Sequence, residues 1–246
     1  AGDLTINQIF LQNGKIDASN AYGGAILNYG NLTLSTCDVN DNTAYRGGAI
    51  YNEGSFDTLW TVYYDNQAVF AGGAIQNSGT MNLDRSIFTN NTSYYGGAVN
   101  NSKAYGTIDS CHFSDNSTIT SFGSGFGGAI SNTSSPITSD VGKLHIDNST
   151  FDDNTAHTGG AFANMDKSEV MFRECSFNGN TASYGGALSN QEEMTITRCS
   201  ITNNSADFYG GAVHVHDTDT SLGTVIGNST LSGNQITMGT SAGGSA

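Results

Sequence analysis

The sequence predicts an all-β fold, a right-handed parallel β-helix, and three observations lead to this prediction. A Gly-Gly-Ala motif recurs along the chain, a large apolar residue followed three positions later by Asn recurs with it, and no stretch keeps a helical 3.6-residue period. Short apolar segments at one regular spacing are typical of strands wound into a solenoid, and parallel crossovers turn right-handed. We expect about nine to ten coils of roughly 24 residues, each with three short strands, in one domain over 1–246.

The glycine pairs set the period. Their first members are separated by 24, 25, 24, 31, 32, 26 and 25 residues. Because glycine accepts a positive φ and close backbone contact without strain, we expect each pair to form a corner between strands. The two longer spacings predict loop insertions near 117–126 and 133–143. The corner glycines are Gly23, Gly24, Gly47, Gly48, Gly72, Gly73, Gly96, Gly97, Gly127, Gly128, Gly159, Gly160, Gly185, Gly186, Gly210 and Gly211.

Two columns of asparagine are expected in the interior. One follows the glycine pair, where an aliphatic residue and an Asn two positions later share a strand face, as do Ile50 and Asn52. The other closes the apolar motif, whose first match is Phe10 with Asn13. Stacked amides can satisfy one another along such columns. The ladder residues are Asn28, Asn52, Asn77, Asn101, Asn132, Asn164 and Asn190 in one column, and Asn42, Asn66, Asn91, Asn116, Asn154, Asn180, Asn204 and Asn234 in the other.

The four cysteines share one position of the repeat, two residues before the closing apolar residue. They are Cys37, Cys111, Cys175 and Cys199. Cys175 and Cys199 would lie on adjacent coils and could approach bonding distance. The sequence leaves this disulfide open beside the alternative of free thiols used as small buried apolar groups.

Charge excludes several classes of partner. Eight Lys and Arg against 22 Asp and Glu give a net charge of −14, which argues against nucleic acid and against anionic membrane surfaces. No apolar run is long enough to predict a membrane span, so we expect no direct membrane insertion of this segment. The abundance of Asn, Ser and Thr favours an extracellular or cell-surface location, and we expect a segment processed or cut from a longer chain.

Paired carboxylates are the residues to consider for an enzyme, because β-helices also carry polysaccharide lyases and hydrolases. One pair falls inside the apolar-to-Asn motif, where other repeats carry unrelated polar residues, and this favours solvated surface over catalysis. The basic residues that a lyase would need are scattered along the chain. The candidate pairs are Asp152 with Asp153, Glu192 with Glu193, and Asp217 with Asp219.

His214, His216 and Asp217 form the one group that resembles a metal site. With Val213 and Val215 turned inward, both imidazoles would point outward on one strand face. The alternative is a solvent-facing histidine pair on a terminal coil, which the sequence favours. We therefore expect no metal and no cofactor.

Glycosylation sequons are frequent in a chain this rich in Asn, Ser and Thr, and those inside the ladders should be buried. For a eukaryotic source, Asn31 and Asn148 are the better glycan candidates.

The two motifs together resemble the signature tetrapeptides of the polymorphic membrane protein (Pmp) repeat of chlamydial autotransporter adhesins and related surface proteins. The likeness is carried by GGAI at 23–26, 47–50, 72–75 and 127–130, and by FTNN, FSDN, FDDN and FNGN starting at Phe88, Phe113, Phe151 and Phe177. It covers essentially the whole chain. The resemblance implies a right-handed β-helical domain displayed outside the cell, with adhesive or structural work and no cofactor.

We therefore expect a non-enzymatic extracellular β-helix with a structural or adhesive role. Its partners would be a host or cell-surface receptor, a glycan, or a second copy stacked head to tail into a fibre. The alternative is a β-helical enzyme that acts on polysaccharides, which would need three or more carboxylates converging in a groove on one sheet face.

Overall fold

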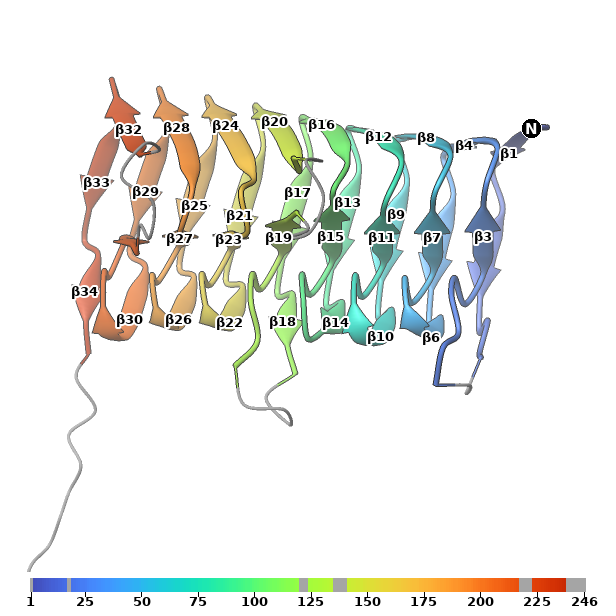
Figure 1. The fold of residues 1–246 in the computed structure, drawn as a ribbon, viewed down its shortest axis with the longest axis horizontal. Helices are drawn as coiled ribbons and strands as arrows, with labels where there is room; N and C mark the ends of the chain where they lie inside the picture. The colour runs from blue at the N-terminus through green and yellow to red at the C-terminus, as the bar shows by residue number, and fades with distance from the viewer. Residues whose placement is uncertain (1, 17–18, 120–123, 135–140, 217–222, 238–246) are drawn as a thin grey trace, which may run out of the picture.

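The computed structural model describes residues 2–16, 19–119, 124–134, 141–216 and 223–237. They form a parallel β-helix in which successive coils stack side by side along one axis (Figure 1). Four sheets run along this axis, every strand pair is parallel, and the register is regular except at two β-bulges in sheet C. None of the described residues belongs to a helix with the length and apolar character that a membrane span requires.

Sheets A and B each contain nine strands. Sheet A consists of β1 (Asp3–Asn7), β4 (Asn31–Ser35), β8 (Ser55–Leu59), β12 (Thr80–Asp84), β16 (Tyr105–Asp109), β20 (Lys143–Asp147), β24 (Glu169–Arg173), β28 (Glu193–Thr197) and β32 (Thr224–Gly227). Sheet B consists of β2 (Phe10–Gln12), β5 (Asp38–Asn40), β9 (Val62–Tyr64), β13 (Ile87–Thr89), β17 (His112–Ser114), β21 (Thr150–Asp152), β25 (Ser176–Asn178), β29 (Ser200–Thr202) and β33 (Thr230–Ser232).

Sheets C and D each contain eight strands. Sheet C consists of β6 (Thr43–Arg46), β10 (Gln67–Ala71), β14 (Thr92–Ser93), β18 (Ser117–Thr118), β22 (Thr155–Thr158), β26 (Thr181–Tyr184), β30 (Ser205–Tyr209) and β34 (Gln235–Ile236). Sheet D consists of β3 (Ile26–Asn28), β7 (Ile50–Asn52), β11 (Ile75–Asn77), β15 (Val99–Ser102), β19 (Ile130–Thr133), β23 (Phe162–Asn164), β27 (Leu188–Asn190) and β31 (Val213–Val215).

The all-β parallel solenoid is as predicted, but a full coil has four short strands where the sequence led us to expect three. The additional strand belongs to sheet C and lies just before the glycine pair. Its inward position holds one small residue per coil, such as Ala44 or Ala68, so it lacks the apolar alternation by which strands are recognised. The predicted insertions near 117–126 and 133–143 lie partly outside the described residues.

The interior is built by stacking like residues on like. Tyr63, Phe88 and Phe113 are fully buried on successive strands of sheet B, and their rings lie 4.6 and 4.7 Å apart with interplanar angles of 2° and 8°. These separations match the spacing of about 4.8 Å between neighbouring strands. Register therefore turns one residue choice per coil into a continuous aromatic stack.

Both asparagine columns form hydrogen-bonded ladders inside the helix. In sheet D, Asn52 Nδ2 donates to Asn77 Oδ1 at 2.7 Å, and Asn77 donates to Asn101 in the same way. In the second ladder the next Asn accepts from both the backbone N–H and the side-chain amide of the one before. Asn66 N and Nδ2 lie 3.1 and 3.0 Å from Asn91 Oδ1. Val215 ends the first column, because it pairs in register with Asn190.

The cysteine column is a third ladder, mixed with Ser and Thr. Its side chains accept the backbone N–H of the preceding coil, as Ser149 Oγ accepts from Cys111 N at 3.1 Å and Cys199 Sγ accepts from Cys175 N at 3.4 Å. All four cysteines are buried and free, so Cys175 and Cys199 are not bridged.

In the first coil, the predicted match of Phe10 and Asn13 to the repeat motif is wrong by one residue. Strand β2 pairs Leu11 with Val39, so Leu11 fills the apolar column and Phe10 is 67 % exposed. The next position in the ladder is then Gly14, whose N–H donates to Asn42 Oδ1 at 2.9 Å. Phe10 and Asn13 match the sequence motif, but each lies one residue before the position that pairs with the apolar column or the asparagine ladder of the next coil.

The glycine pairs form corners that leave no space for a side chain. The first member has a positive φ, as Gly96 does at +62°. A Cβ on the second member would meet the next coil, since at Gly97 it would stand 2.0 Å from the carbonyl oxygen of Gly128. Successive coils are therefore in backbone contact at this corner.

We predict that Gly97→Val destabilises the fold by about 3 kcal/mol or more, the upper part of the range for overpacking, because the added Cβ collides with backbone that cannot rotate away. Gly227→Val is the matched control, since a Cβ there meets nothing within 4 Å. Urea unfolding followed by circular dichroism measures both. Equal midpoints for the two variants would refute the close contact.

We predict that Asn91→Ala lowers the free energy of unfolding by about 3 kcal/mol, because it leaves two donors of Asn66 and the carbonyl of Tyr63 unpaired at about 1–3 kcal/mol each. Asn31→Ala, at an exposed position, should change it by less than about 0.5 kcal/mol. The same urea titration measures both, and similar losses in the two variants would contradict a stabilising ladder.

Candidate functional site

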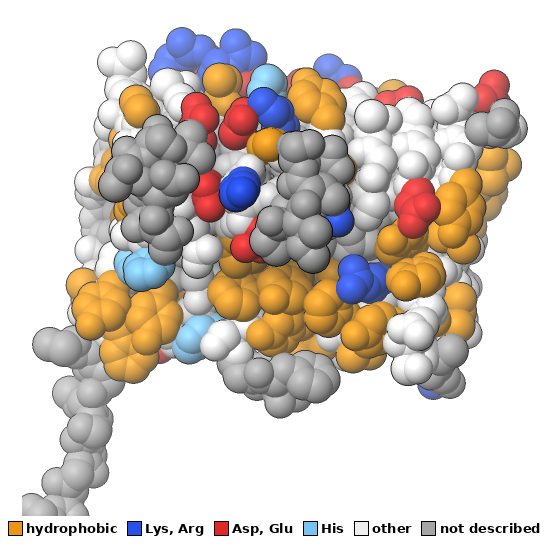
Figure 2. All heavy atoms as spheres, in the orientation of Figure 1, with side chains coloured by type: hydrophobic (Ala, Val, Ile, Leu, Met, Phe, Trp, Pro, Cys, Tyr) orange, Lys and Arg blue, Asp and Glu red, His pale blue; other side chains and the backbone are white. Residues whose placement is uncertain are grey.

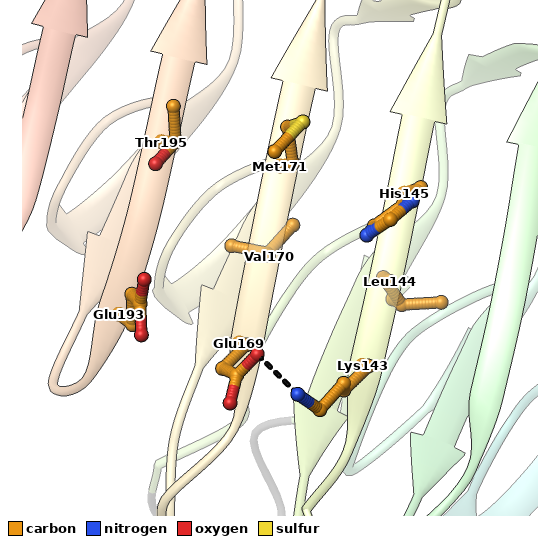
Figure 3. A pocket seen from close by; sticks show the side chains of 8 residues that line it. All are labelled: Lys143, Leu144, His145, Glu169, Val170, Met171, Glu193 and Thr195. Carbon is orange, nitrogen blue, oxygen red and sulfur yellow. Dashed lines mark hydrogen bonds and ion pairs between the residues drawn. The ribbon is translucent and has the colours of Figure 1, made fainter.

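One hollow on the outer face of sheet A gathers charged side chains. Figure 3 shows Lys143, Glu169 and Glu193 side by side on β20, β24 and β28, with His145 on the next row. Register places Lys143 opposite Glu169 and Glu169 opposite Glu193. Lys143 Nζ lies 2.6 Å from Glu169 Oε2, so the Glu169 carboxylate is engaged in an ion pair.

The size of this hollow limits its chemistry. Its volume of about 60 Å³ is room for about two water molecules. The Lys143 and Glu169 side chains are 46 % and 38 % exposed, so the site does not exclude water around a reacting group. Glu193 thus has a carboxylate neighbour, Glu169, which the sequence pattern did not indicate, but this hollow cannot enclose a sugar ring.

The other predicted carboxylates lie apart from this hollow. Asp152 is on sheet B, where burial raises its pKa and the nearby His112, 3.6 Å away, lowers it. Asp153 follows it at a left-handed corner. Glu192 is buried beside the end of the asparagine ladder and donates its N–H to Asn190 Oδ1. Asp217 and Asp219 lie outside the described residues. The two described pairs lie apart, since Asp152 is on sheet B and Glu193 is on sheet A.

The predicted histidine pair lies at the end of β31, with His214 on the strand and His216 directly after it. The rings of His214 and His216 are 6.1 Å apart and nearly parallel, at 21°. Burial lowers the pKa of His214, and the neighbouring His216 lowers it further, so both effects favour the neutral imidazole. Within the described part of the chain, no three His, Cys, Asp or Glu side chains are grouped to hold a metal ion. The third predicted ligand, Asp217, is not among the described residues.

Both glycan candidates are exposed. Asn31, on β4 of sheet A, donates to Asp3 Oδ1 at 2.7 Å, and Asn148 donates to Asp109 Oδ1 at 2.8 Å. Each side-chain amide is therefore accessible to a glycan, and attachment would break one surface hydrogen bond.

A larger feature follows sheet C. Hydrophobic side chains gather in a band across the lower half of the face in Figure 2, where Figure 1 places this sheet. Phe208 and Tyr209 are 52 % and 62 % exposed, and the other rings are half-buried. We call this surface the aromatic band; its rings are Tyr45, Phe70, Tyr94, Tyr95, Phe126, Tyr184, Phe208 and Tyr209.

Ring geometry separates the aromatic band from the interior stack. Tyr45 and Phe70 lie 5.6 Å apart at 13°, which exceeds the coil spacing of about 4.8 Å, so these rings overlap only in part. Phe70 and Tyr95 meet at 59°, and Tyr94 and Tyr95 at 82°. Rings arranged this way leave parts of their faces open to a ligand. Arg46 also contacts the band, with its guanidinium carbon 4.4 Å from the Phe70 centroid.

Two β-bulges enlarge the aromatic band. Strand β10 pairs Ala68 with Ala44 but Ala71 with Arg46, so it carries one more residue than β6. Strand β30 has the same irregularity against β26. The bulged segments hold Val69, which is 42 % exposed, and Phe208. Bulges redirect side chains without disturbing the neighbouring coils, and here they turn apolar groups outward.

Two hollows lie along the aromatic band. The first, of about 420 Å³, is lined by Tyr45, Val69, Phe70, Tyr94 and Tyr95. The second, of about 300 Å³, is lined by Phe126, Thr158, Tyr184, Ser189, Gln191, Tyr209, His214 and His216. The second hollow therefore includes the histidine pair and combines rings with hydroxyl, amide and imidazole groups.

Sequence reasoning missed the aromatic band. A signal was present, because the residue before the glycine pair is aromatic in five of the eight repeats. These residues are Tyr22, Tyr95, Phe126, Tyr184 and Tyr209. A position that varies between aromatic, Arg46, Ala71 and Thr158 does not look like a core column, and its outward direction becomes clear only from the strand pairing.

Comparison with known proteins adds the family. Neither the comparison with curated proteins nor that with solved structures gives a match. A family model described as "Right handed beta helix region" matches residues 65–236, which is more than half of the chain. The match agrees with the predicted right-handed winding and with the stacked parallel sheets. The chain belongs to the right-handed β-helix family.

Proposed function

We propose that this β-helix is a non-enzymatic, extracellular surface protein with an adhesive role, and that the aromatic band is its contact surface. The observation that carries the proposal is the band itself, a file of partly exposed rings from Tyr45 on β6 to Tyr209 on β30. Contiguous apolar surface of this kind marks interaction sites on soluble proteins.

The fold does not need these rings for its own core. The interior is already filled by the stacks and ladders, and the inward residues of sheet C are small ones such as Ala44 and Ala182. The resemblance of the two motifs to Pmp repeats of surface adhesins supports an extracellular location and an adhesive role. A cell-surface receptor or glycan is then the partner.

The enzymatic alternative has one observation in its favour, the neighbouring carboxylates of Glu169 and Glu193. Glycosidases use such pairs, but they also enclose the sugar so that one carboxyl has a raised pKa. The hollow of about 60 Å³ provides no such enclosure, and Glu169 is already paired with Lys143. We therefore favour binding without turnover.

Stacking into a fibre is a finer form of the proposal. The first and last described coils expose apolar side chains whose register partners are buried; Leu4 is 51 % exposed opposite Leu32, and Ile226 is 41 % exposed opposite Ile196. Strands at these two ends of sheet A have one free edge, which can pair with another strand. Either further coils or a second copy would cover them.

We predict that the chain forms concentration-dependent, end-to-end oligomers, and that Val225→Lys shifts them to monomer because a charged edge strand resists pairing. Size-exclusion chromatography and negative-stain imaging measure this, with Val69→Lys, on a strand paired on both sides, as the control. A stable monomer at high concentration would argue against the fibre.

For adhesion, we predict that beads coated with the chain retain cultured epithelial or bacterial cells, and that Phe70→Ser reduces retention by about tenfold or more. Truncating a central interface ring costs about 2 kcal/mol, and 1.4 kcal/mol is a factor of ten. Trp60→Ser is the control, because Trp60 is an exposed aromatic outside the band. Bound cells are counted by microscopy.

Two results would overturn the proposal. One is equal retention of cells by the chain and by Phe70→Ser. The other is release of reducing sugar ends from a polysaccharide, abolished by Glu193→Gln, which would establish the enzymatic alternative.

A further inference from the structure

We infer that the aromatic band is a binding track for an extended, uncharged polysaccharide. The inference rests on the proposed function, since it names the ligand of the adhesive surface. Three properties of the band support it: its shape, the chemistry of its lining and the charge around it.

The shape is long and narrow. The rings come from β6, β10, β26 and β30, from Tyr94 and Tyr95 after β14, and from Phe126, which pairs with Tyr95, so they follow the helix axis with one coil, that of β22, between Phe126 and Tyr184. Phe126, which lines the second hollow, stacks on Tyr95 of the first at 5.4 Å and 9°, and this joins the two. The coil spacing of about 4.8 Å is close to the length of one sugar residue in an extended chain.

A globular protein partner suits this geometry less well. Specific protein interfaces bury about 800 Å² on each partner in a broad patch. The aromatic band has one or two rings in each coil except that of β22, where Thr158 stands in the column between Phe126 and Tyr184. It is bounded on one side by the glycine corners. A linear polymer can follow such a file and repeat similar weak contacts on the coils that carry rings, which together give useful avidity.

The lining combines apolar faces with neutral polar groups. Tyrosine presents an apolar ring and a hydroxyl that donates and accepts hydrogen bonds. The second hollow adds the Gln191 amide, the Ser189 hydroxyl and the His214 imidazole, whose Nδ1 has no hydrogen-bond partner. A sugar ring has the complementary surface, because its C–H faces pack on aromatic rings while its hydroxyls bond at the rim.

Charge then excludes the acidic polysaccharides. The chain carries −14 net, and recognition of repeated carboxylates or sulfates needs repeated Arg or Lys side chains. Arg46 is the basic side chain recorded against the band, and its guanidinium lies over Phe70. The lining residues of both hollows carry neither Lys nor Arg. The ligand class is therefore a neutral, hydroxyl-rich chain.

The test is co-sedimentation of the full chain with insoluble cellulose, chitin and mannan, beside polygalacturonate cross-linked to beads. We expect retention on at least one neutral polysaccharide, unaffected by added salt. Phe70→Ser and Tyr184→Ser should each reduce the retained fraction by about tenfold, as loss of one stacked ring would. Trp60→Ser should bind like the parent chain, and circular dichroism melts confirm that each variant is folded.

The same beads used for adhesion separate this inference from the proposed function. Periodate oxidises the neighbouring hydroxyls of surface glycans, so adhesion through a glycan should fall after cells are treated. If the chain sediments with none of the neutral polysaccharides and Phe70-dependent adhesion survives periodate, the ligand is a protein and the inference is wrong, while the adhesive role stands. Salt-sensitive binding to polygalacturonate alone would also overturn it.

Discussion

The hydrogen bond between buried asparagines of successive coils is the constraint on which the rest of the structure depends. Asn66 contributes both its backbone N–H and its side-chain amide to Asn91 Oδ1, and the ladder continues in both directions. A buried amide without a partner costs about 1–3 kcal/mol, so each coil must return its Asn to the same place. Extra residues are tolerated only where they leave this register intact, which is why the repeat lengthens in loops and bulges.

A fixed interior leaves the outward positions free to differ. The buried rings of Tyr63 and Phe88 are held parallel at 4.6 Å by the register itself. Outward rings that are register partners also stack, as Tyr95 and Phe126 do at 5.4 Å and 9°. Phe70 instead lies in the bulge of β10, where Ala71 is the partner of Tyr95, and its ring meets Tyr95 at 59°. The interior therefore holds one regular stack, while a bulge on the outer face changes the angles between rings.

Most inward positions could be predicted from the sequence, and most outward positions could not. Inward columns repeat because each coil needs them, so the strand faces of Ile50 and Asn52 and the fold class were readable from spacing alone. Sheet C was missed because its inward residue is small, as at Ala44, and the band was missed with it. The error at Phe10 has a related cause. A motif match does not show which residue pairs with the next coil, and only the pairing of Leu11 with Val39 shows which residue faces inward.

The contrast between the two outer faces argues for binding over catalysis. A catalytic carboxyl needs a dry, shaped enclosure that shifts its pKa and holds the substrate in one position. The hollow on sheet A is small, and its ion pair between Lys143 and Glu169 is partly exposed to solvent. Sheet C instead carries bulges at β10 and β30 that break the ladder locally and expose Val69 and Phe208. Because a bulge and an exposed ring both cost stability, their joint placement beside two hollows supports the proposed ligand-binding role of the aromatic band.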